Sequence, residues 1–151
     1  MELKIGDKVP NFTAIDTNGN NYDSNNNIGK QAVVLYFYPK DDTKVCTDQA
    51  CSFRDQYEDF KELGAEIIGV SGDSFATHKK FATKYKLPFI LLSDSSKKLR
   101  KLFGVPSDLF GLIPGRVTYV IDKNGILVYV FNSMSGKIHI TKALSFLKKN
   151  K

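Results

Sequence analysis

The sequence predicts an α/β fold with a mixed central sheet, flanking helices and an N-terminal hairpin. Three observations lead to this prediction. Residues 32–38 form an apolar run of β-branched and aromatic residues without polar alternation, which is typical of a central strand buried on both faces. After this run, helix-like and strand-like segments alternate along the chain. A second hairpin pattern then precedes a closing helix.

The other strands are predicted from short apolar runs bounded by turn residues. Two of them form the N-terminal hairpin, and two form a hairpin closed by Lys123-Asn124-Gly125. The predicted strands lie at 12–15, near 22, at 65–70, at 88–92, at 116–121 and at 126–131.

The helices are predicted from apolar residues at three- and four-residue steps. Gly64 is expected to cap the first helix at its C-terminus. Ser95 or Ser96 is expected to begin the third helix, and Gly104 to end it. The predicted helices lie at 47–63, at 74–85, from the Ser95–Ser96 pair to residue 103, and at 137–148.

The length of 151 residues predicts one domain, 1–151, with a core large enough to fold unaided. No apolar run approaches the roughly 20 residues of a membrane span. The first residues resemble neither a signal peptide nor a transit peptide, so we expect a cytoplasmic protein, or an organellar one if a leader is removed.

The net charge of +6 comes mainly from lysines scattered among acidic residues, which favours a solvated surface over nucleic-acid binding.

Cys46 and Cys51 are the only cysteines, and two cysteines do not make the disulfide framework of a small secreted domain. Cys46 follows a strand and opens a helix, where backbone amides and the helix dipole favour a thiolate. A zinc site from both cysteines, His78 and His139 lacks the usual two- to four-residue cysteine spacing, so we expect no metal. Both histidines are expected at the surface.

Pro39, Thr43 and Cys46 match the Pro-x-x-x-Thr-x-x-Cys signature of the peroxiredoxins, and the chain resembles that family. Its cysteine spacing is similar to that of the bacterioferritin comigratory protein/peroxiredoxin Q subgroup, an atypical two-cysteine type. The resemblance implies a thioredoxin fold of the peroxiredoxin type. One difference is Lys44-Val45, where the subgroup usually has Pro-Gly. Further matching segments are 36–40, 53–55, 69–73, 84–89, 91–94 and 114–119.

The resemblance implies a thiol-dependent peroxidase for hydrogen peroxide and alkyl hydroperoxides. Cys46 would be the peroxidatic cysteine, whose thiolate becomes a sulfenic acid, and Cys51 would resolve it as an intramolecular disulfide. Thioredoxin or a similar dithiol would reduce that disulfide. No cofactor is implied, whether metal, flavin or haem. The subgroup favours a monomer, with a weak dimer as the alternative.

The resemblance also assigns groups around the sulfur of Cys46. The cationic fork of Arg116 would bind both the sulfur and a peroxide oxygen. Thr43 would accept a hydrogen bond from the peroxide and donate one to the thiolate. Pro39 would cover the sulfur and exclude water. The backbone amides of Val45 and Cys46 would point at the substrate.

The five-residue spacing of the two cysteines leads to a further expectation. Residues five apart in an ideal helix have Cα atoms about 8.6 Å apart, whereas a disulfide needs less than about 7 Å. We therefore predict that this helix unwinds locally in each catalytic cycle. Gln49 lies three residues after Cys46, on the same helical face, and is expected to help orient Arg116.

Two other functions are compatible with a close cysteine pair. A thioredoxin-type disulfide reductase or isomerase is disfavoured because the chain has no Cys-x-x-Cys. A non-enzymatic redox sensor or thiol chaperone would use the same disulfide for signalling. Four apolar residues are expected to line the site mouth or to form a docking patch for a reductant or second subunit: Phe103, Leu109, Phe110 and Leu112.

Overall fold

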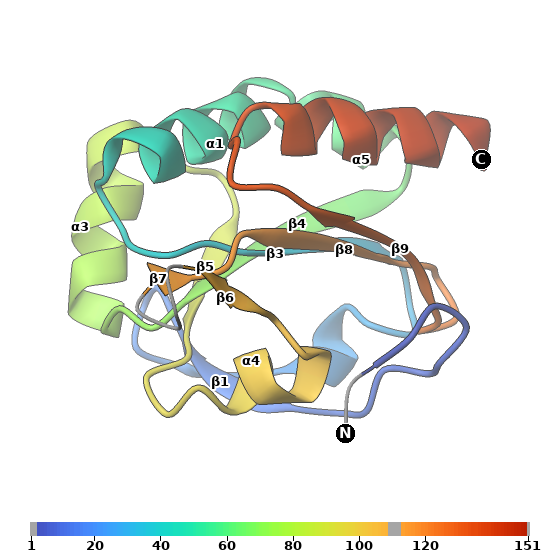
Figure 1. Cartoon of the computed structure of the whole chain (residues 1–151), viewed down its shortest axis with the longest axis horizontal. Helices are drawn as coiled ribbons and strands as arrows, with labels where there is room; N and C mark the ends of the chain where they lie inside the picture. The colour runs from blue at the N-terminus through green and yellow to red at the C-terminus, as the bar shows by residue number, and fades with distance from the viewer. Residues whose placement is uncertain (1–2, 109–112, 151) are drawn as a thin grey trace.

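A computed structural model describes residues 3–108 and 113–150, which surround a seven-stranded mixed sheet (Figure 1). The strand order is β2-β1-β5-β4-β3-β8-β9. The central β3, β4 and β5 are parallel, while β1, β8 and β9 run antiparallel to their neighbours. The strands are β1 Thr13–Asp16, β2 Asn21–Asp23, β3 Ala32–Phe37, β4 Ala65–Ser71, β5 Ile90–Ser93, β8 Val117–Ile121 and β9 Leu127–Asn132, with a separate pair β6 Ser107–Asp108 and β7 Ile113–Pro114.

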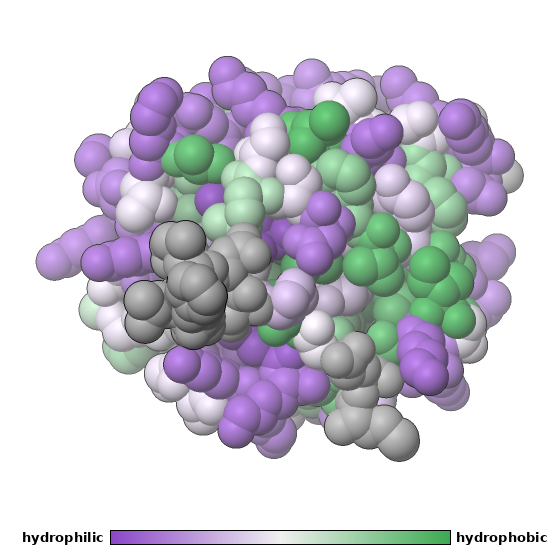
Figure 2. Space-filling model, viewed as in Figure 1, coloured by the Kyte–Doolittle hydropathy of each residue, from purple (hydrophilic) through white to green (hydrophobic). Residues whose placement is uncertain are grey.

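Helices cover both faces of the sheet, as predicted. In Figure 1, α1 and α5 lie above the sheet and α4 lies below it. Within the described residues, every helix is too short or too polar to cross a bilayer. Polar residues cover most of the face seen in Figure 2, with apolar residues in smaller areas between them. The helices are α1 Lys44–Asp55, α2 Tyr57–Glu62, α3 Phe75–Tyr85, α4 Lys98–Phe103 and α5 Ile138–Lys149, with a short 3-10 helix at Ser24–Asn26.

Strand β3 separates two hydrophobic clusters. Val34 and Tyr36 pack on the side of α1, α3 and α5, whereas Leu35 and Phe37 pack on the side of α4. All four side chains are fully buried. The prediction of a central strand buried on both faces is therefore confirmed.

The predicted helix 47–63 is two helices, and it begins earlier than expected. Thr43 has an extended backbone and serves as the N-cap, so the first turn of α1 starts at Lys44. The chain leaves helical geometry at Gln56, whose N–H still donates to the Ser52 carbonyl. The early start matters because it places Cys46 within the first turn, where backbone N–H groups lack helical partners.

The prediction that Ser95 or Ser96 caps the third helix is wrong. Lys97 is the N-cap residue of α4, and its side chain makes no cap hydrogen bond. The carboxylate of Asp94 supplies the acceptors instead: its two oxygens accept from the backbone N–H groups of Leu99 at 2.9 Å and Arg100 at 3.0 Å. A carboxylate at this end also opposes the positive end of the helix dipole. The expected end of this helix is confirmed, since Gly104 adopts a left-handed conformation with φ 70°.

The expected apolar patch near the site is not supported for Phe103. Its side chain is buried in the cluster below the sheet, where it contacts the rings of Phe12, Phe37 and Tyr119. Sequence periodicity placed it on a helix but did not show which layer that helix covers. The other three members of that predicted patch, Leu109, Phe110 and Leu112, lie outside the described residues.

Candidate active site

The candidate nucleophile Cys46 lies where the β3 strand passes into α1. It is 2% exposed. The first i→i−4 hydrogen bond of the helix runs from the Thr47 N–H to the Thr43 carbonyl, at 2.8 Å. The backbone amides of Val45 and Cys46 therefore precede the first helical donor. This end of α1 has the positive pole of the helix dipole, so it favours an anion at the sulfur or beside it.

Arg116 brings a buried positive charge to the sulfur of Cys46. It directly precedes β8, which pairs antiparallel with β3 and so returns to the same end of the sheet. Its Nη2 donates to Cys46 Sγ at 3.3 Å, and its Nε donates to the Met134 carbonyl at 3.1 Å. The arginine is 2% exposed. A charged donor binds a thiolate more strongly than a thiol, so this contact is suited to an anionic sulfur.

Gln49 holds the second terminal nitrogen of Arg116. The Gln49 side chain is fully buried in α1, and its Oε1 accepts from Arg116 Nη1 at 2.6 Å. The loop before α5 packs on the same turn, because a Cβ at Gly136 would lie 2.8 Å from the Val45 carbonyl oxygen and 3.1 Å from Gln49 Cβ. Helix, arginine and loop thus form one packed unit around Cys46.

Thr43 and Pro39 lie in the turn between β3 and α1. The Thr43 hydroxyl donates to the Lys40 carbonyl at 2.9 Å, rather than to the sulfur of Cys46 as the resemblance implied. A hydroxyl that donates one hydrogen bond can still accept another, so a peroxide O–H has an acceptor here. Pro39 is half-buried at the end of β3.

Cys51 lies further along α1, is half-buried and is a free thiol, like Cys46. Burial raises the pKa of the Cys51 thiol, with smaller contributions from Asp48 and Asp55, and the charge of Arg54 opposes the shift. This thiol is therefore protonated near neutral pH. The helix is continuous through both cysteines.

The turn before Cys46 is held by α3, through residues that sequence reasoning missed. His78 was expected at the surface, but it is fully buried, and its Nδ1 lies 2.6 Å from Asp41 Oδ2. The Tyr38 hydroxyl donates to the other oxygen of Asp41, and the Asp41 N–H donates to Asp73 at 2.8 Å. His78 lies on the same face of α3 as Phe81, which is in the core. That helical spacing could have indicated from the sequence that His78 is buried.

His139 is also fully buried, contrary to the prediction. Its Nδ1 lies 2.7 Å from the Thr118 hydroxyl, and its Nε2 lies 2.7 Å from the Ser133 carbonyl. Burial, together with the smaller effect of the Arg116 charge, lowers the pKa of His139 to about 4, although the hydrogen bond to the Ser133 carbonyl opposes the shift. The spacing to Ala143 on the buried face of α5 would have indicated this position.

The four residues considered for zinc are not brought together as one site. The His78 ring contacts Asp41 and the Leu92 carbonyl, whereas His139 contacts Thr118 and Ser133. Ligand atoms of Asp41, Asp73 and His78 do lie within 4.8 Å of one another. Hydrogen bonds already join Asp41 to both of the others, and these bonds account for the cluster.

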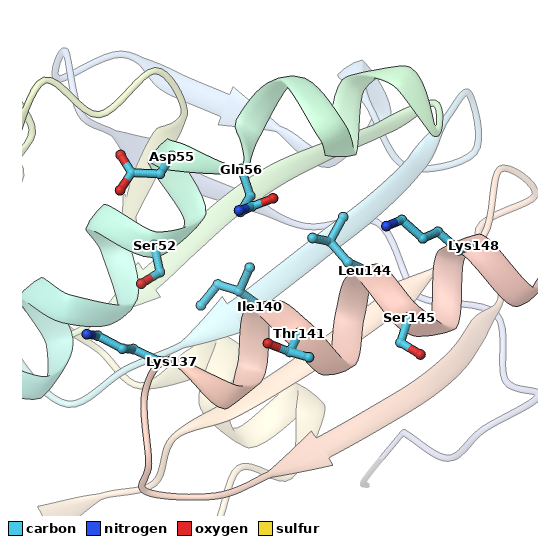
Figure 3. Close-up of a pocket in the computed structure, with 9 residues that line it drawn as sticks. All are labelled: Ser52, Asp55, Gln56, Lys137, Ile140, Thr141, Leu144, Ser145 and Lys148. Atoms are coloured by element: carbon cyan, nitrogen blue, oxygen red, sulfur yellow. The ribbon is translucent and has the colours of Figure 1, made fainter.

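A shallow groove of about 510 Å³ lies between the end of α1 and α5 (Figure 3). Cys46, Cys51 and Arg116 are not among the residues that line it. Polar and charged side chains line much of it, among them Ser52, Asp55, Gln56, Lys137, Thr141 and Lys148.

Together, the fold and this site define a thiol-dependent peroxidase with a thioredoxin fold. The chain belongs to the AhpC/TSA family, whose pattern matches residues 5–130. It is 55% identical over 148 residues to "Peroxiredoxin Q, chloroplastic" from Arabidopsis thaliana, and 53% identical over 148 residues to the protein of that name from Oryza sativa subsp. japonica. Both alignments cover 97% of this chain and 68% of the relative.

Solved structures agree with this assignment. Peroxidoxin BcpB from Mycobacterium tuberculosis superposes with a TM-score of 0.91 at 34% identity, covering 99% of each chain. A mutant of PrxQ from Xylella fastidiosa superposes with a TM-score of 0.91 at 27% identity, covering 99% of this chain and 98% of that one. The predicted fold and family are therefore confirmed.

Proposed function

We propose that Cys46 is the peroxidatic cysteine and that Arg116 stabilises both its thiolate and the transition state. The observation that carries this proposal is the 3.3 Å contact between Arg116 Nη2 and Cys46 Sγ, at the N-terminus of α1. The thiolate attacks one peroxide oxygen and the O–O bond breaks. The other oxygen takes up a proton and leaves as water or an alcohol, and Cys46 becomes a sulfenic acid.

The surrounding groups have distinct roles in this proposal. Arg116 neutralises the charge that develops on the leaving oxygen, and Gln49 holds the arginine in place. Thr43 accepts from the peroxide O–H, and the backbone amides of Val45 and Cys46 donate to its oxygens. Pro39 shields the sulfur from water.

Cys51 then resolves the sulfenic acid. Its sulfur attacks the sulfur of Cys46, a disulfide forms and water leaves. The continuous helix keeps residues five apart near 8.6 Å between Cα atoms, about 2 Å too far for a disulfide. Local unwinding of α1 must therefore precede this step. In an oxidised crystal structure, an intact helix from Cys46 to Cys51 with the disulfide in place would contradict the proposal.

A dithiol protein of the thioredoxin type completes the cycle by supplying two electrons and two protons. We propose that residues 1–151 act as one domain and as a monomer. A weak dimer is the alternative, and sedimentation at rising concentration distinguishes the two.

The names of the plant relatives support a chloroplast location rather than the expected cytoplasm, which subcellular fractionation tests.

The test is hydrogen peroxide turnover with thioredoxin, thioredoxin reductase and NADPH. We expect turnover by the wild type, none by Cys46→Ser, and a single round of oxidation by Cys51→Ser. Full thioredoxin-dependent turnover by Cys51→Ser would contradict the resolving role. If the protein were a redox sensor instead, the wild type itself would be oxidised once by peroxide and would be reduced again only slowly.

A further inference from the structure

A second buried arginine, Arg100, lies at the same end of the sheet as Arg116. It comes from α4, on the face opposite α1, and is 8% exposed. Burial lowers its pKa from the usual value, and the charges of Asp94 and of a Cys46 thiolate oppose that shift. Arg100 therefore brings a second buried positive charge to this end of the sheet, from the other layer of the fold.

The guanidinium of Arg100 joins the two central strands just beyond their last paired residues. Strands β3 and β8 pair as far as Phe37 and Val117. Arg100 Nη2 donates to the Tyr38 carbonyl at 2.8 Å, and Nη1 donates to the Gly115 carbonyl at 3.3 Å. The planar guanidinium thus donates hydrogen bonds to two buried carbonyl groups at the point where the pairing of β3 with β8 ends.

These two carbonyls directly precede two residues of the proposed site. Tyr38 is followed by Pro39, and Gly115 by Arg116. Gly115 is held from its other side as well, because its N–H donates to the Pro106 carbonyl at 2.8 Å. A Cβ at Gly115 would lie only 2.2 Å from that same oxygen, so the close approach requires glycine.

We propose that Arg100 is a positioning residue of the peroxidase site. It fixes the strand ends that carry Pro39 and Arg116, and its buried charge adds to the positive field at Cys46. This inference rests on the proposed function, because it assumes that Cys46 is the reacting thiol. Arg100 does not itself touch the sulfur or the peroxide.

The test compares Arg100→Gln and Arg100→Lys in a Cys51→Ser background. The first readout is the second-order rate constant for Cys46 oxidation by hydrogen peroxide, followed by quenched flow and mass spectrometry. The second is the ratio of iodoacetamide alkylation rates of Cys46 at pH 6 and pH 9, which reports the thiolate fraction. Two variants in the same helix serve as controls: Lys101→Gln removes an exposed charge, and Leu99→Ala weakens the core without removing a charge.

We expect Arg100→Gln to lower the rate constant at least about tenfold and to lower the alkylation ratio. Arg100→Lys should preserve the ratio, since the charge remains, but lower the rate constant about threefold or more, since a single ammonium cannot hold both carbonyls. Leu99→Ala should lower the melting temperature and leave the ratio unchanged, and Lys101→Gln should change neither readout.

A folded Arg100→Gln protein that stays within about twofold of its parent in both readouts would overturn the proposal. If Arg100→Gln does not fold, the Arg100→Lys protein becomes the deciding variant. A rate constant for Cys46 oxidation equal to that of the parent would then overturn the proposal. Failure of the parent to react with peroxide would instead refute the proposed function, and the alkylation ratio would still test Arg100.

Discussion

Arg116 Nη2 lies 3.3 Å from Cys46 Sγ, although the two residues are 70 positions apart in the chain. The antiparallel pairing of β3 with β8 brings them to one end of the sheet. Both are buried, and a charge interacts more strongly with its partner where water is excluded. This contact is therefore the main electrostatic feature of the site.

Replacing Arg116 with lysine tests the need for a planar fork. Lysine keeps the charge but cannot bind the sulfur, Gln49 and a peroxide oxygen together. We expect the rate constant for Cys46 oxidation to fall about 100-fold, equivalent to about 2.7 kcal/mol of transition-state stabilisation. Arg54→Lys is the control, since Arg54 binds the Tyr85 carbonyl instead. An Arg116→Lys protein as fast as this control would refute the role of Arg116.

Gln49→Leu tests whether the amide positions the arginine. The leucine removes the acceptor of Arg116 Nη1 and leaves a buried donor unpaired, which costs about 1–3 kcal/mol. We expect Cys46 oxidation to slow by about tenfold. Gln56→Leu changes the same residue type at the end of α1 and should leave the rate unchanged. Equal rates for the two variants would show that Gln49 only fills space.

The raised pKa of Cys51 predicts unequal reactivity of the two thiols. In Cys46→Ser, Cys51 should react with iodoacetamide at pH 7.5 more slowly than free cysteine, because less of it is thiolate and α1 shields it. In Cys51→Ser, Cys46 should react faster than Cys51 does. The reverse order would mean that the attacking thiol has been misassigned.

The buried His139 predicts that stability falls in mild acid. Its pKa is about 4 in the folded protein and near 6.5 in the unfolded chain, so the unfolded state binds the extra proton between these values. The free energy of unfolding should therefore decrease as the pH falls from 6.5 to 4, by up to about 3 kcal/mol from this residue. Urea titrations of the wild type and His139→Gln measure it. Parallel pH profiles for the two proteins would contradict the prediction.

The Asp41–His78 contact should contribute strongly to the stability of the turn before Cys46. Removing one partner of a buried hydrogen bond leaves the other partner unsatisfied, which costs about 1–3 kcal/mol. We expect His78→Phe to unfold at lower urea concentration by such an amount, and the double variant with Asp41→Asn to recover part of the loss. Additive losses would show that the two residues do not stabilise each other.

The sequence predicted the sheet and helices well, because strand and helix periodicities report directly which faces are buried. The family resemblance placed Arg116 at Cys46, and helical spacing placed Gln49 on the same face of the helix, so the contact of Gln49 with Arg116 was expected. The sequence did not predict the contacts made across layers. Arg100 bridges two strands from a distant helix, and Asp94 supplies the acceptors near the start of that helix in place of Ser95 or Ser96.

The two histidines show the same limit. Each was expected at the surface because lysines surround it or because it lies near a chain end. Each instead has a side-chain and a carbonyl partner inside the fold: Asp41 and Leu92 for His78, and Thr118 and Ser133 for His139. A polar residue on an apolar helix face can be buried only if the tertiary fold supplies such partners.

The most direct test of the account is intact-protein mass spectrometry after one equivalent of hydrogen peroxide. We predict that the wild type loses about 2 Da as the Cys46–Cys51 disulfide forms, and that Cys51→Ser gains about 16 Da as the sulfenic acid. Cys46→Ser should keep its mass under the same conditions. Oxidation of Cys46→Ser at the wild-type rate would contradict the claim that Cys46, held by Arg116, is the thiol that cleaves the peroxide.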